Sequence, residues 1–298
     1  MKPLKLGVLG ISPGNGHPYS WSAIFNGYDP AVMADCPFPV IPRYLAERRF
    51  PEDAIAGANV THVWTQDRAA SEHIAAAALI PTVVAQPEEM IRQVDAILLA
   101  RDDAENHMTH AAPFLAAGLP IYIDKPLALS RAAALALYGR QKQPGLVFTC
   151  SALAFAREFR LTSEERTALG PLRYVEAVAP KDWDRYAIHV IEPLLNLIGA
   201  QGEIRRAKAS GSEVRTLDLE WASGLTGRIV TLGVPAGPIE IRLYGEHGFR
   251  TLRFEDSFEA FRAALSVFTE IVTGVRPSQT PEQVLPIIDI IEAGRSAP

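Results

Sequence analysis

Residues 4–16 read Leu-Lys-Leu-Gly-Val-Leu-Gly-Ile-Ser-Pro-Gly-Asn-Gly, an apolar run that passes directly into a glycine-rich stretch. The run predicts a buried strand over Leu4–Leu9, and the glycines predict a tight turn before a helix that starts near Pro18. This order lets backbone N–H groups approach a pyrophosphate at a helix N-terminus. The fingerprint G-x-G-x-x-G is imperfect, because Ser12 stands where the second glycine belongs. Alone, the turn fits a phosphate-binding loop and a structural turn equally well.

The first half of the chain alternates β-like runs with alanine-rich helical segments. The expected strands are Leu4–Leu9, Val60–Thr65, Thr82–Val84, Ala96–Ala100, Ile121–Asp124 and Leu146–Thr149. The expected helices between them are Ala69–Leu79, His107–Ala117 and Ala132–Tyr138. Strands that are apolar on both faces and alternate with helices predict an α/β fold with a doubly wound parallel sheet. We assign residues 1–150 to this Rossmann, dinucleotide-binding domain.

The pattern changes after Cys150, where strand-like runs follow one another with short turns. These runs are Leu172–Val178, Arg205–Ser210, Arg215–Trp221, Gly227–Leu232, Ile239–Tyr244 and Gly248–Phe254. They predict a mainly antiparallel open sheet. Helices are expected at Tyr186–Ile198, Ser257–Thr273 and Pro281–Gly294. Residues 151–298 are therefore assigned to an α+β domain for substrate binding and oligomerisation, whose C-terminal helix can pack back on the first domain.

The segment between residues 28 and 55 fits neither pattern, because it is rich in proline and aromatic residues. Structureless connections of this length are uncommon and often functional. Two interpretations stay open: a surface excursion with a small helix at Tyr44–Arg49, or a wall of the active site.

Composition narrows the functional class. A hydrophobic fraction of 48% and a charged fraction of 21% are typical of a globular protein. The net charge of −5, without a long basic run, argues against nucleic acid or an anionic membrane as partner. No apolar stretch approaches the ~20 residues of a membrane helix, and the first run is too short for a signal peptide. Two cysteines, Cys36 and Cys150, suit a reducing compartment, so the cytoplasm is expected.

A longer motif lies in residues 94–128. Val-Asp-Ala opens an apolar run at Val94, His107 follows, and Ala-Gly at residues 117–118 precedes Asp124-Lys125-Pro126-Leu-Ala. This stretch closely resembles the glucose–fructose oxidoreductase and inositol dehydrogenase (Gfo/Idh/MocA) family, with its pattern V-D-A, H, A-G, E-K-P-h-A. Asp124 replaces the family's glutamate, whereas Lys125 and Pro126 match. Further segments resemble the family in order along nearly the whole chain: 71–81, 189–199, 239–248 and 268–293.

The resemblance implies a nicotinamide cofactor, NAD or NADP, in the first domain. The residues it places around the cofactor are Gly10, Ile11, Ser12, Gly14, Asn15, Gly16, Thr65, Asp67, Arg101, Asp102, His107, Asp124 and Lys125. Asp67 would bind the ribose hydroxyls, or would instead cap the helix that follows.

Two catalytic residues are implied by the family. Lys125 would lie beside the nicotinamide, hydrogen-bond the reacting oxygen and exchange a proton with it; the alternative is an ordinary surface lysine. His189 matches the catalytic histidine of the family's H-x-x-D-L-L helix, although Arg185 stands where that family carries an aspartate one turn earlier.

The missing aspartate leaves several partners open for His189. Asp182 or Asp184 could replace it, the relay could use Lys181 or Tyr186, or His189 could be a structural core residue. The residues expected to contact substrate are Lys125, Asp184, Tyr186 and His189.

Other polar residues near the motif also carry alternatives. The run Arg101-Asp102-Asp103 could bind substrate hydroxyls or form a solvated turn. His107 and His110 share a helix face, but without a third ligand we expect no metal. His17 and Ser20 could face a pyrophosphate or belong to a packed helix N-terminus.

The sequence therefore predicts an NAD(P)-dependent oxidoreductase that transfers hydride to or from a hydroxyl or carbonyl of a sugar, cyclitol or sugar derivative. The small polyhydroxylated substrate would lie against the open face of the second sheet, in a homodimer or homotetramer. The alternative is a catalytically altered or inactive nucleotide-binding scaffold, which Ser12 and Arg185 favour. A lyase- or hydrolase-type reaction that uses the cofactor only transiently is a third possibility.

Overall fold

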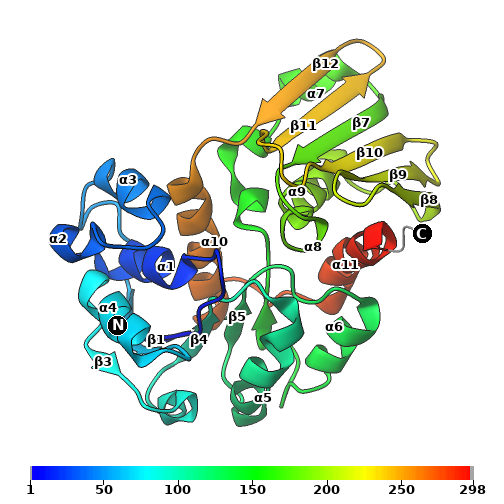
Figure 1. Cartoon of the computed structure of the whole chain (residues 1–298). Coiled ribbons are helices and arrows are strands. Elements are labelled where there is room, and N and C mark those ends of the chain that lie inside the picture. Colours follow the sequence, from blue (N-terminus) through cyan, green and yellow to red (C-terminus); the bar gives the residue numbers. More distant parts are fainter. Residues whose placement is uncertain (1, 296–298) are drawn as a thin grey trace. The chain divides into compact units, whose positions relative to one another are not determined.

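The computed structural model describes residues 2–295 and divides into two compact units. Unit 1 comprises Met1–Leu127, Leu135–Thr149 and Ser257–Pro281, and unit 2 comprises Ala128–Ala134, Cys150–Asp256 and Glu282–Pro298. The chain thus returns to unit 1 for helix α10 (Ser257–Val272) before helix α11 (Pro281–Arg295) continues into unit 2 (Figure 1).

Unit 1 contains the predicted doubly wound sheet. Its strands are β1 (Leu4–Leu9), β2 (Ala58–Trp64), β3 (Thr82–Val83), β4 (Ala96–Leu99), β5 (Ile121–Ile123) and β6 (Val147–Phe148). All neighbours pair in parallel in the order β3-β2-β1-β4-β5-β6, which confirms the prediction. The strands β1 to β3 are added toward one edge of the sheet and β4 to β6 toward the other, so the strand order reverses between β1 and β4. Open α/β sheets bind their ligands at the carboxyl ends of the strands at this point.

Helices α1 (His17–Asn26), α4 (Arg68–Ala77), α5 (His107–Ala117) and α6 (Arg131–Tyr138) follow strands, as expected. Short 3₁₀ turns, η1 (Pro87–Met90) and η2 (Ala104–Asn106), lie between them. A chain of aromatic contacts joins α1 to the sheet and to α10. The ring centroid of Trp21 lies 4.7 Å from that of Tyr122, which lies 4.9 Å from Phe148 and 5.7 Å from Phe268.

The proline-rich segment is packed, and its helices differ from the prediction. They are α2 (Pro30–Met33) and α3 (Val40–Ala46), so the expected helix Tyr44–Arg49 is wrong. The helix starts earlier because Pro42 falls in its first turn, where the missing N–H of proline has no intrahelical partner to lose. Tyr44 donates a hydrogen bond to Ser20 of α1, and the Arg48 guanidinium lies 4.8 Å from the ring centroid of Phe258 in α10. These contacts cover α1 and α10 within unit 1.

Unit 2 contains the second sheet, shown as an open sheet in Figure 1. Its strands are β7 (Leu172–Ala179), β8 (Ile204–Ser210), β9 (Arg215–Trp221), β10 (Thr226–Thr231), β11 (Glu240–Gly245) and β12 (Phe249–Arg253). The order is β12-β11-β7-β10-β9-β8, and every pair is antiparallel except β7 with β10. The predicted mainly antiparallel sheet is therefore confirmed.

The remaining elements of unit 2 are η3 (Ala152–Phe155), η4 (Arg157–Phe159), α7 (Ser163–Leu169), α8 (Trp183–Tyr186) and α9 (Ile188–Ile198). The single helix expected at Tyr186–Ile198 is thus two helices that meet at Ala187. Helix α9 contacts β7 and β11, and alternate residues of β7, such as Val175 and Ala177, are buried. Across residues 2–295, no helix combines the length and apolar character needed to cross a membrane.

Candidate active site

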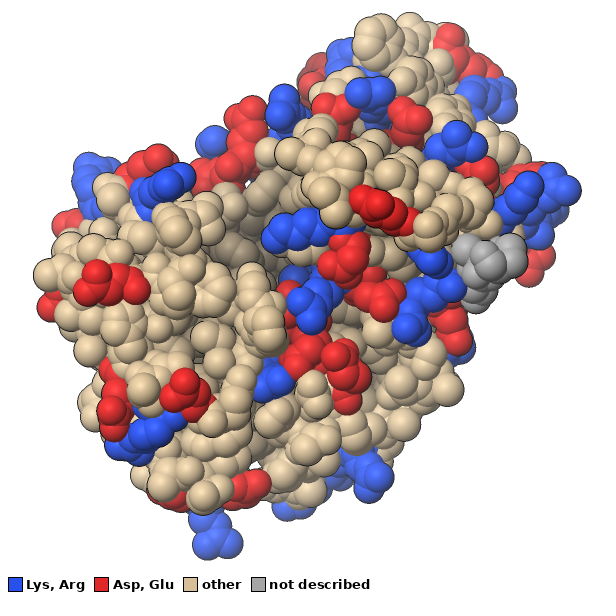
Figure 2. All heavy atoms as spheres, in the orientation of Figure 1, with Lys and Arg blue, Asp and Glu red and all other residues tan. Residues whose placement is uncertain are grey.

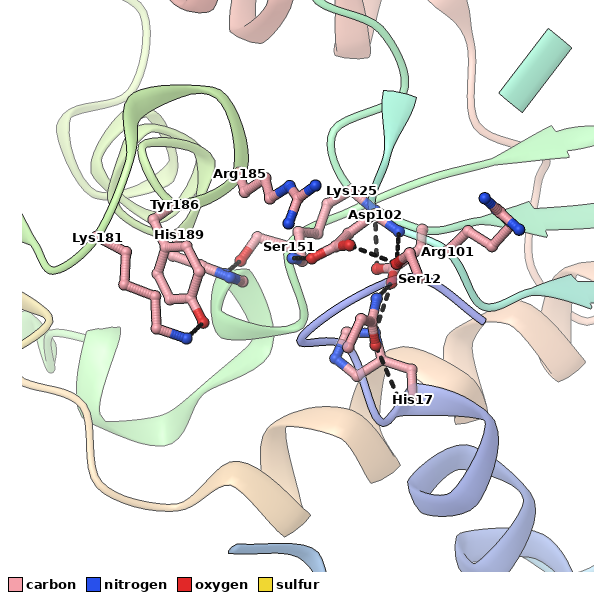
Figure 3. Close-up of polar contacts among 12 residues, drawn as sticks. Ser12, His17, Arg101, Asp102, Lys125, Ser151, Lys181, Arg185, Tyr186 and His189 are labelled. Atoms are coloured by element: carbon pink, nitrogen blue, oxygen red, sulfur yellow. Dashed lines mark hydrogen bonds and ion pairs between the residues drawn. The ribbon is translucent and has the colours of Figure 1, made fainter. Parts of the chain in front are cut away.

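The glycine-rich turn after β1 meets the loop after β4, because Leu9 pairs with Leu99 in the parallel register. Gly10 has φ +81°, and a Cβ there would lie 2.5 Å from the Arg101 Cδ, so only glycine fits. The Ser12 hydroxyl donates to Asp102 Oδ1 at 2.6 Å and accepts from the Asp102 N–H at 3.2 Å (Figure 3). Ser12, which breaks the glycine fingerprint, therefore ties the two loops together.

Gln66, after β2, fastens the same turn and was not predicted. Its Nε2 donates to the Ile11 carbonyl at 2.6 Å, and its Oε1 accepts from the Ile11 N–H at 3.4 Å and from Arg101 Nη1 at 3.1 Å. Nothing in the local sequence distinguishes this glutamine from a solvated turn residue, because its partners belong to two other strand ends.

Asp124, at the end of β5, is buried beneath the turn. Its Oδ2 accepts from Asn15 Nδ2 at 2.8 Å and lies 2.5 Å from His17 Nδ1, and its Oδ1 accepts from the Lys125 N–H at 2.8 Å. His17 is stacked on Trp21 at a centroid distance of 4.9 Å, and Ser20 accepts from Tyr44. His17 and Ser20 thus have protein partners in this structure.

Lys125 is buried, in contrast to an ordinary surface lysine. Its side chain is 5% exposed, and Nζ lies 3.4 Å from Oδ2 of Asp102, whose side chain is 8% exposed. The Lys125–Pro126 peptide bond is cis. Ser12, Asp102 and Lys125 form one hydrogen-bonded group at the carboxyl ends of β1, β4 and β5 (Figure 3).

The run Arg101-Asp102-Asp103 is buried and is not a solvated turn. The Arg101 guanidinium donates to both carboxylate oxygens of Asp103, and Asn106 Nδ2 donates to Oδ2 at 2.6 Å. Burial acts to raise the pKa of Asp103, but the hydrogen bonds from Arg101 and Asn106 outweigh it, so this pKa lies below its ordinary value. The loop is therefore a charged, rigid support for the site.

His107 is fully buried and contacts backbone carbonyls with both ring nitrogens. Nε2 lies 2.7 Å from the Arg101 oxygen, and Nδ1 lies 3.1 Å from the Leu127 oxygen. The pKa of His110 is lowered, first by burial and then by the charge of Arg101. Within the described part of the chain, no group of three or more His, Cys, Asp or Glu side chains is placed to hold a metal.

The expected ribose-binding residues follow β2. Asp67 Oδ1 accepts from the N–H groups of Ala69 and Ala70 at 2.9 and 3.4 Å, so it caps α4. Thr65 is buried, and its hydroxyl donates to the Asp67 carbonyl at 2.6 Å. A pocket of about 270 Å³ lies beside these residues and is lined by Trp64, Thr65, Gln66, Arg68, Ser71, Val84, Ala85 and Gln86.

The turn has room for a phosphate group. Gly14 has φ +81°, and among the described residues no atom beyond its chain neighbours lies within 4 Å of where its Cβ would be. At Gly16, before α1, a Cβ would lie 2.5 Å from Ile41 Cδ1, and this residue gives α1 no side-chain cap. The open space beside the Gly14 backbone fits a phosphate of a dinucleotide. At the start of α1, by contrast, the His17 N–H donates to Asn15 Oδ1 at 2.8 Å and Pro18 has no N–H.

In unit 2, His189 of α9 contacts a residue that the sequence did not predict. Its Nδ1 lies 2.9 Å from the Ser151 hydroxyl, and both residues are buried (Figure 3). Asp182 caps α8 through the Arg185 N–H, and Asp184 pairs with Arg295 at 3.0 Å. We infer that Ser151, not Asp182 or Asp184, takes the place of the missing aspartate.

Tyr186 and Lys181 lie together beside this histidine. The Lys181 ammonium donates to the Tyr186 hydroxyl and lies 4.3 Å from the centroid of its ring. The Tyr186 ring packs edge-on against His189 at 5.3 Å. A cavity of about 580 Å³ in unit 2 is lined by Lys181, Asp182, Trp183, Asp184, Ser212, Glu213, Arg215, Gly233, Val234 and Arg295.

Glu192 lies one turn after His189, at the acidic position of the H-x-x-D pattern. Its Oε2 accepts from the Ser151 N–H at 2.5 Å. Burial raises the pKa of Glu192 from 4.5 to about 8, and the Ser151 N–H only partly opposes this rise. The carboxyl group is therefore largely protonated at neutral pH.

Replacing Glu192 with glutamine should make stability less dependent on pH. The unfolded protein releases the Glu192 proton above pH 4.5 and the folded protein only near pH 8. The wild type therefore loses stability as pH rises through this window, whereas glutamine has no proton to lose. Urea unfolding should give the two proteins similar free energies of unfolding at pH 4. At pH 8 the variant should be more stable by a few kcal/mol, on the order of 1.4 kcal/mol for each unit by which the pKa is raised. An equal difference at both pH values would contradict the raised pKa.

Comparison with known proteins agrees with this geometry. Residues 44–151 match the family described as "Oxidoreductase family, NAD-binding Rossmann fold" (GFO_IDH_MocA). None of the curated proteins compared matches the chain.

Solved structures share the fold over almost the whole chain. GenD2 from gentamicin A biosynthesis in complex with NAD is 18% identical, with a TM-score of 0.75, and the alignment covers 100% of this chain and 95% of that one. UDP-N-acetylglucosamine 3-dehydrogenase GnnA from Acidithiobacillus ferrooxidans is 16% identical, with a TM-score of 0.73 and coverages of 100% and 98%. Myo-inositol 2-dehydrogenase from Lactobacillus plantarum is 13% identical, with a TM-score of 0.73, and the alignment covers 99% of this chain and 97% of that one.

Fold, site and family match define an NAD(P)-dependent oxidoreductase. Within the chain, residues 44–151 carry the match to the Gfo/Idh/MocA family model. The matched segment contains Lys125 and the loop after β4, but it starts after the glycine-rich turn, where Ser12 departs from the family pattern.

Proposed function

We propose that this enzyme transfers hydride to or from a carbon that carries a hydroxyl or carbonyl group in a sugar, cyclitol or sugar derivative. The observation that carries the proposal is the buried Lys125, held by Asp102 and Ser12 at the edge of the sheet where this fold binds its ligands. Two proteins of similar structure are a UDP-N-acetylglucosamine 3-dehydrogenase and a myo-inositol 2-dehydrogenase, which supports the polyhydroxylated class of substrate.

In this proposal the nicotinamide, when bound, supplies or accepts the hydride. The Gly10–Gly16 turn binds the pyrophosphate through bare backbone, with Asn15 held by Asp124. The Lys125 ammonium donates a hydrogen bond to the reacting oxygen and transfers its proton as negative charge develops there. Asp102 keeps the ammonium in place, and Ser12 orients Asp102.

The residues of unit 2 are proposed to bind substrate. His189 would donate to or accept from a substrate hydroxyl through Nε2, while Ser151 fixes its ring through Nδ1. Tyr186 and Asp184 would contribute further polar contacts. Because Ser151 is a neutral hydroxyl, it supports a charged imidazole less than a carboxylate would, so we assign the main proton transfer to Lys125.

Three further features are part of the proposal. The exposed face of the second sheet carries Tyr174 and the Arg228–Asp218 ion pair, which supports a homodimer or homotetramer formed through that face. Sedimentation velocity, which measures the mass of the assembly in solution, tests this oligomeric state. The chain has only two cysteines, both buried, which are too few for a disulfide framework and support a reducing, cytoplasmic location. On the face drawn in Figure 2, basic and acidic side chains are interspersed, so no single basic patch suggests nucleic acid.

A direct assay separates this function from an inactive scaffold. We expect calorimetry to show binding of NAD(H) or NADP(H), and a panel of sugars, cyclitols and sugar nucleotides to contain a compound that changes the absorbance of the reduced nicotinamide. Binding without turnover on any compound would favour the scaffold. No binding of either dinucleotide at millimolar concentration would overturn the proposal.

A further inference from the structure

The pocket of about 270 Å³ after β2 lies where Rossmann folds bind the ribose of the adenosine half. Its lining combines two glutamines, Gln66 and Gln86, with hydroxyl, apolar and aromatic side chains. Arg68 is the charged member of this set. A pocket with a cation and no carboxylate in its lining suits an anionic ligand group.

Asp67, the acid that would select a free 2′-hydroxyl, does not line the pocket. Its carboxylate oxygen accepts two backbone N–H groups at the start of α4, and such caps contribute about 1 kcal/mol. The Thr65 hydroxyl donates to the Asp67 carbonyl. If this carboxylate turned toward the ribose, α4 would lose the hydrogen bonds that cap its N-terminus.

Arg68 is the first residue of α4, with its side chain 58% exposed. Its Nε donates to Glu72 Oε1 at 2.6 Å, in an exposed pair one helical turn apart. Such pairs contribute only about 0.3–0.5 kcal/mol. A phosphate group, which an arginine binds with two parallel hydrogen bonds, can displace Glu72 at little cost.

We propose that the enzyme binds NADP(H) in preference to NAD(H), and that Arg68 pairs with the 2′-phosphate. The inference rests on the dinucleotide site of the proposed function and adds which dinucleotide binds there. NADP(H) differs from NAD(H) by the 2′-phosphate on the adenosine ribose, and this group is the one that Arg68 would recognise.

Calorimetric titration of the purified protein with NADP⁺ and NAD⁺ tests this choice. The wild type should bind NADP⁺ at least about tenfold more tightly. Arg68→Ala should weaken NADP⁺ binding by about 10–100-fold, as expected for hydrogen bonds to a charged group, and should leave NAD⁺ binding within about threefold. The same contrast should appear between 2′,5′-ADP and ADP, which lack the nicotinamide.

Two variants control the charge change. Arg140→Ala removes an exposed arginine after α6, at the other edge of the sheet, and should alter neither affinity. Glu72→Gln removes the competing partner of Arg68 and should strengthen NADP⁺ binding but not NAD⁺ binding. Thermal unfolding checks that each variant is folded.

The outcomes distinguish this inference from the proposed function. If NAD⁺ binds as tightly as NADP⁺, or if Arg68→Ala weakens both equally, the preference is wrong while the oxidoreductase proposal stands. If neither dinucleotide binds to the wild type, both proposals are overturned.

Discussion

Replacing Lys125 with methionine is expected to lower turnover by about 10²–10⁴-fold, the usual contribution of a general acid–base residue. The loss should fall on turnover because the ammonium contacts the reacting oxygen most strongly as charge develops in the transition state. Cofactor affinity should change little, since the glycine-rich turn and Asp124 keep their hydrogen bonds. Measured kcat on the active substrate, together with the calorimetric Kd of the cofactor, gives the comparison.

Three further variants make this result interpretable. Lys142→Met removes an exposed lysine of unit 1 and should leave kcat unchanged. His189→Asn should lose less than Lys125→Met, because Nδ1 of His189 faces the neutral Ser151. If the loss of the Lys125 ammonium beside Asp102 destabilises Lys125→Met, the double variant Lys125→Met/Asp102→Asn removes the buried negative charge and keeps the test. Near-normal turnover in the folded Lys125→Met protein would refute the assignment.

Replacing Asp124 with alanine is expected to lower the free energy of unfolding by about 2–4 kcal/mol and to weaken dinucleotide binding. The buried carboxylate accepts from Asn15 and from the Lys125 N–H and contacts His17 Nδ1. Alanine leaves these buried groups without their partner, and it releases Asn15, which belongs to the phosphate-binding turn. One carboxylate thus stabilises both the sheet edge and the binding loop.

Urea unfolding and calorimetry measure the two effects of Asp124→Ala. Asp124→Asn should be intermediate, because it keeps an oxygen for the Lys125 N–H but turns an amide donor toward Asn15. Asp95→Ala is the matched control: its carboxylate accepts the Lys5 N–H at 2.8 Å at an exposed position near the start of β1 and β4. If Asp124→Ala and Asp95→Ala destabilise equally, Asp124 has no special role in the site.

The local hydrophobic pattern of the sequence was sufficient to predict most helices and strands. The apolar run Leu4–Leu9 and the alternation that follows it predicted the parallel sheet, because buried strands and amphipathic helices differ in hydrophobic period. The boundaries failed where proline chemistry decided them, as at Val40–Ala46. Lys125 was predicted from its motif, and the glycine at position 10 from its turn.

The sequence by itself determined most of the elements, the resemblance to an oxidoreductase family and the residue types of the candidate site. Only the tertiary structure decided which of these residues act together. Ser12 meets Asp102, 90 positions away, and His189 meets Ser151, 38 positions away. Gln66 similarly reaches Ile11, and Asp67 is engaged by its own helix rather than by the pocket. Such pairs depend on strand order and on the register of the sheet, which arise from packing of the whole unit and have no counterpart in the local hydrophobic pattern.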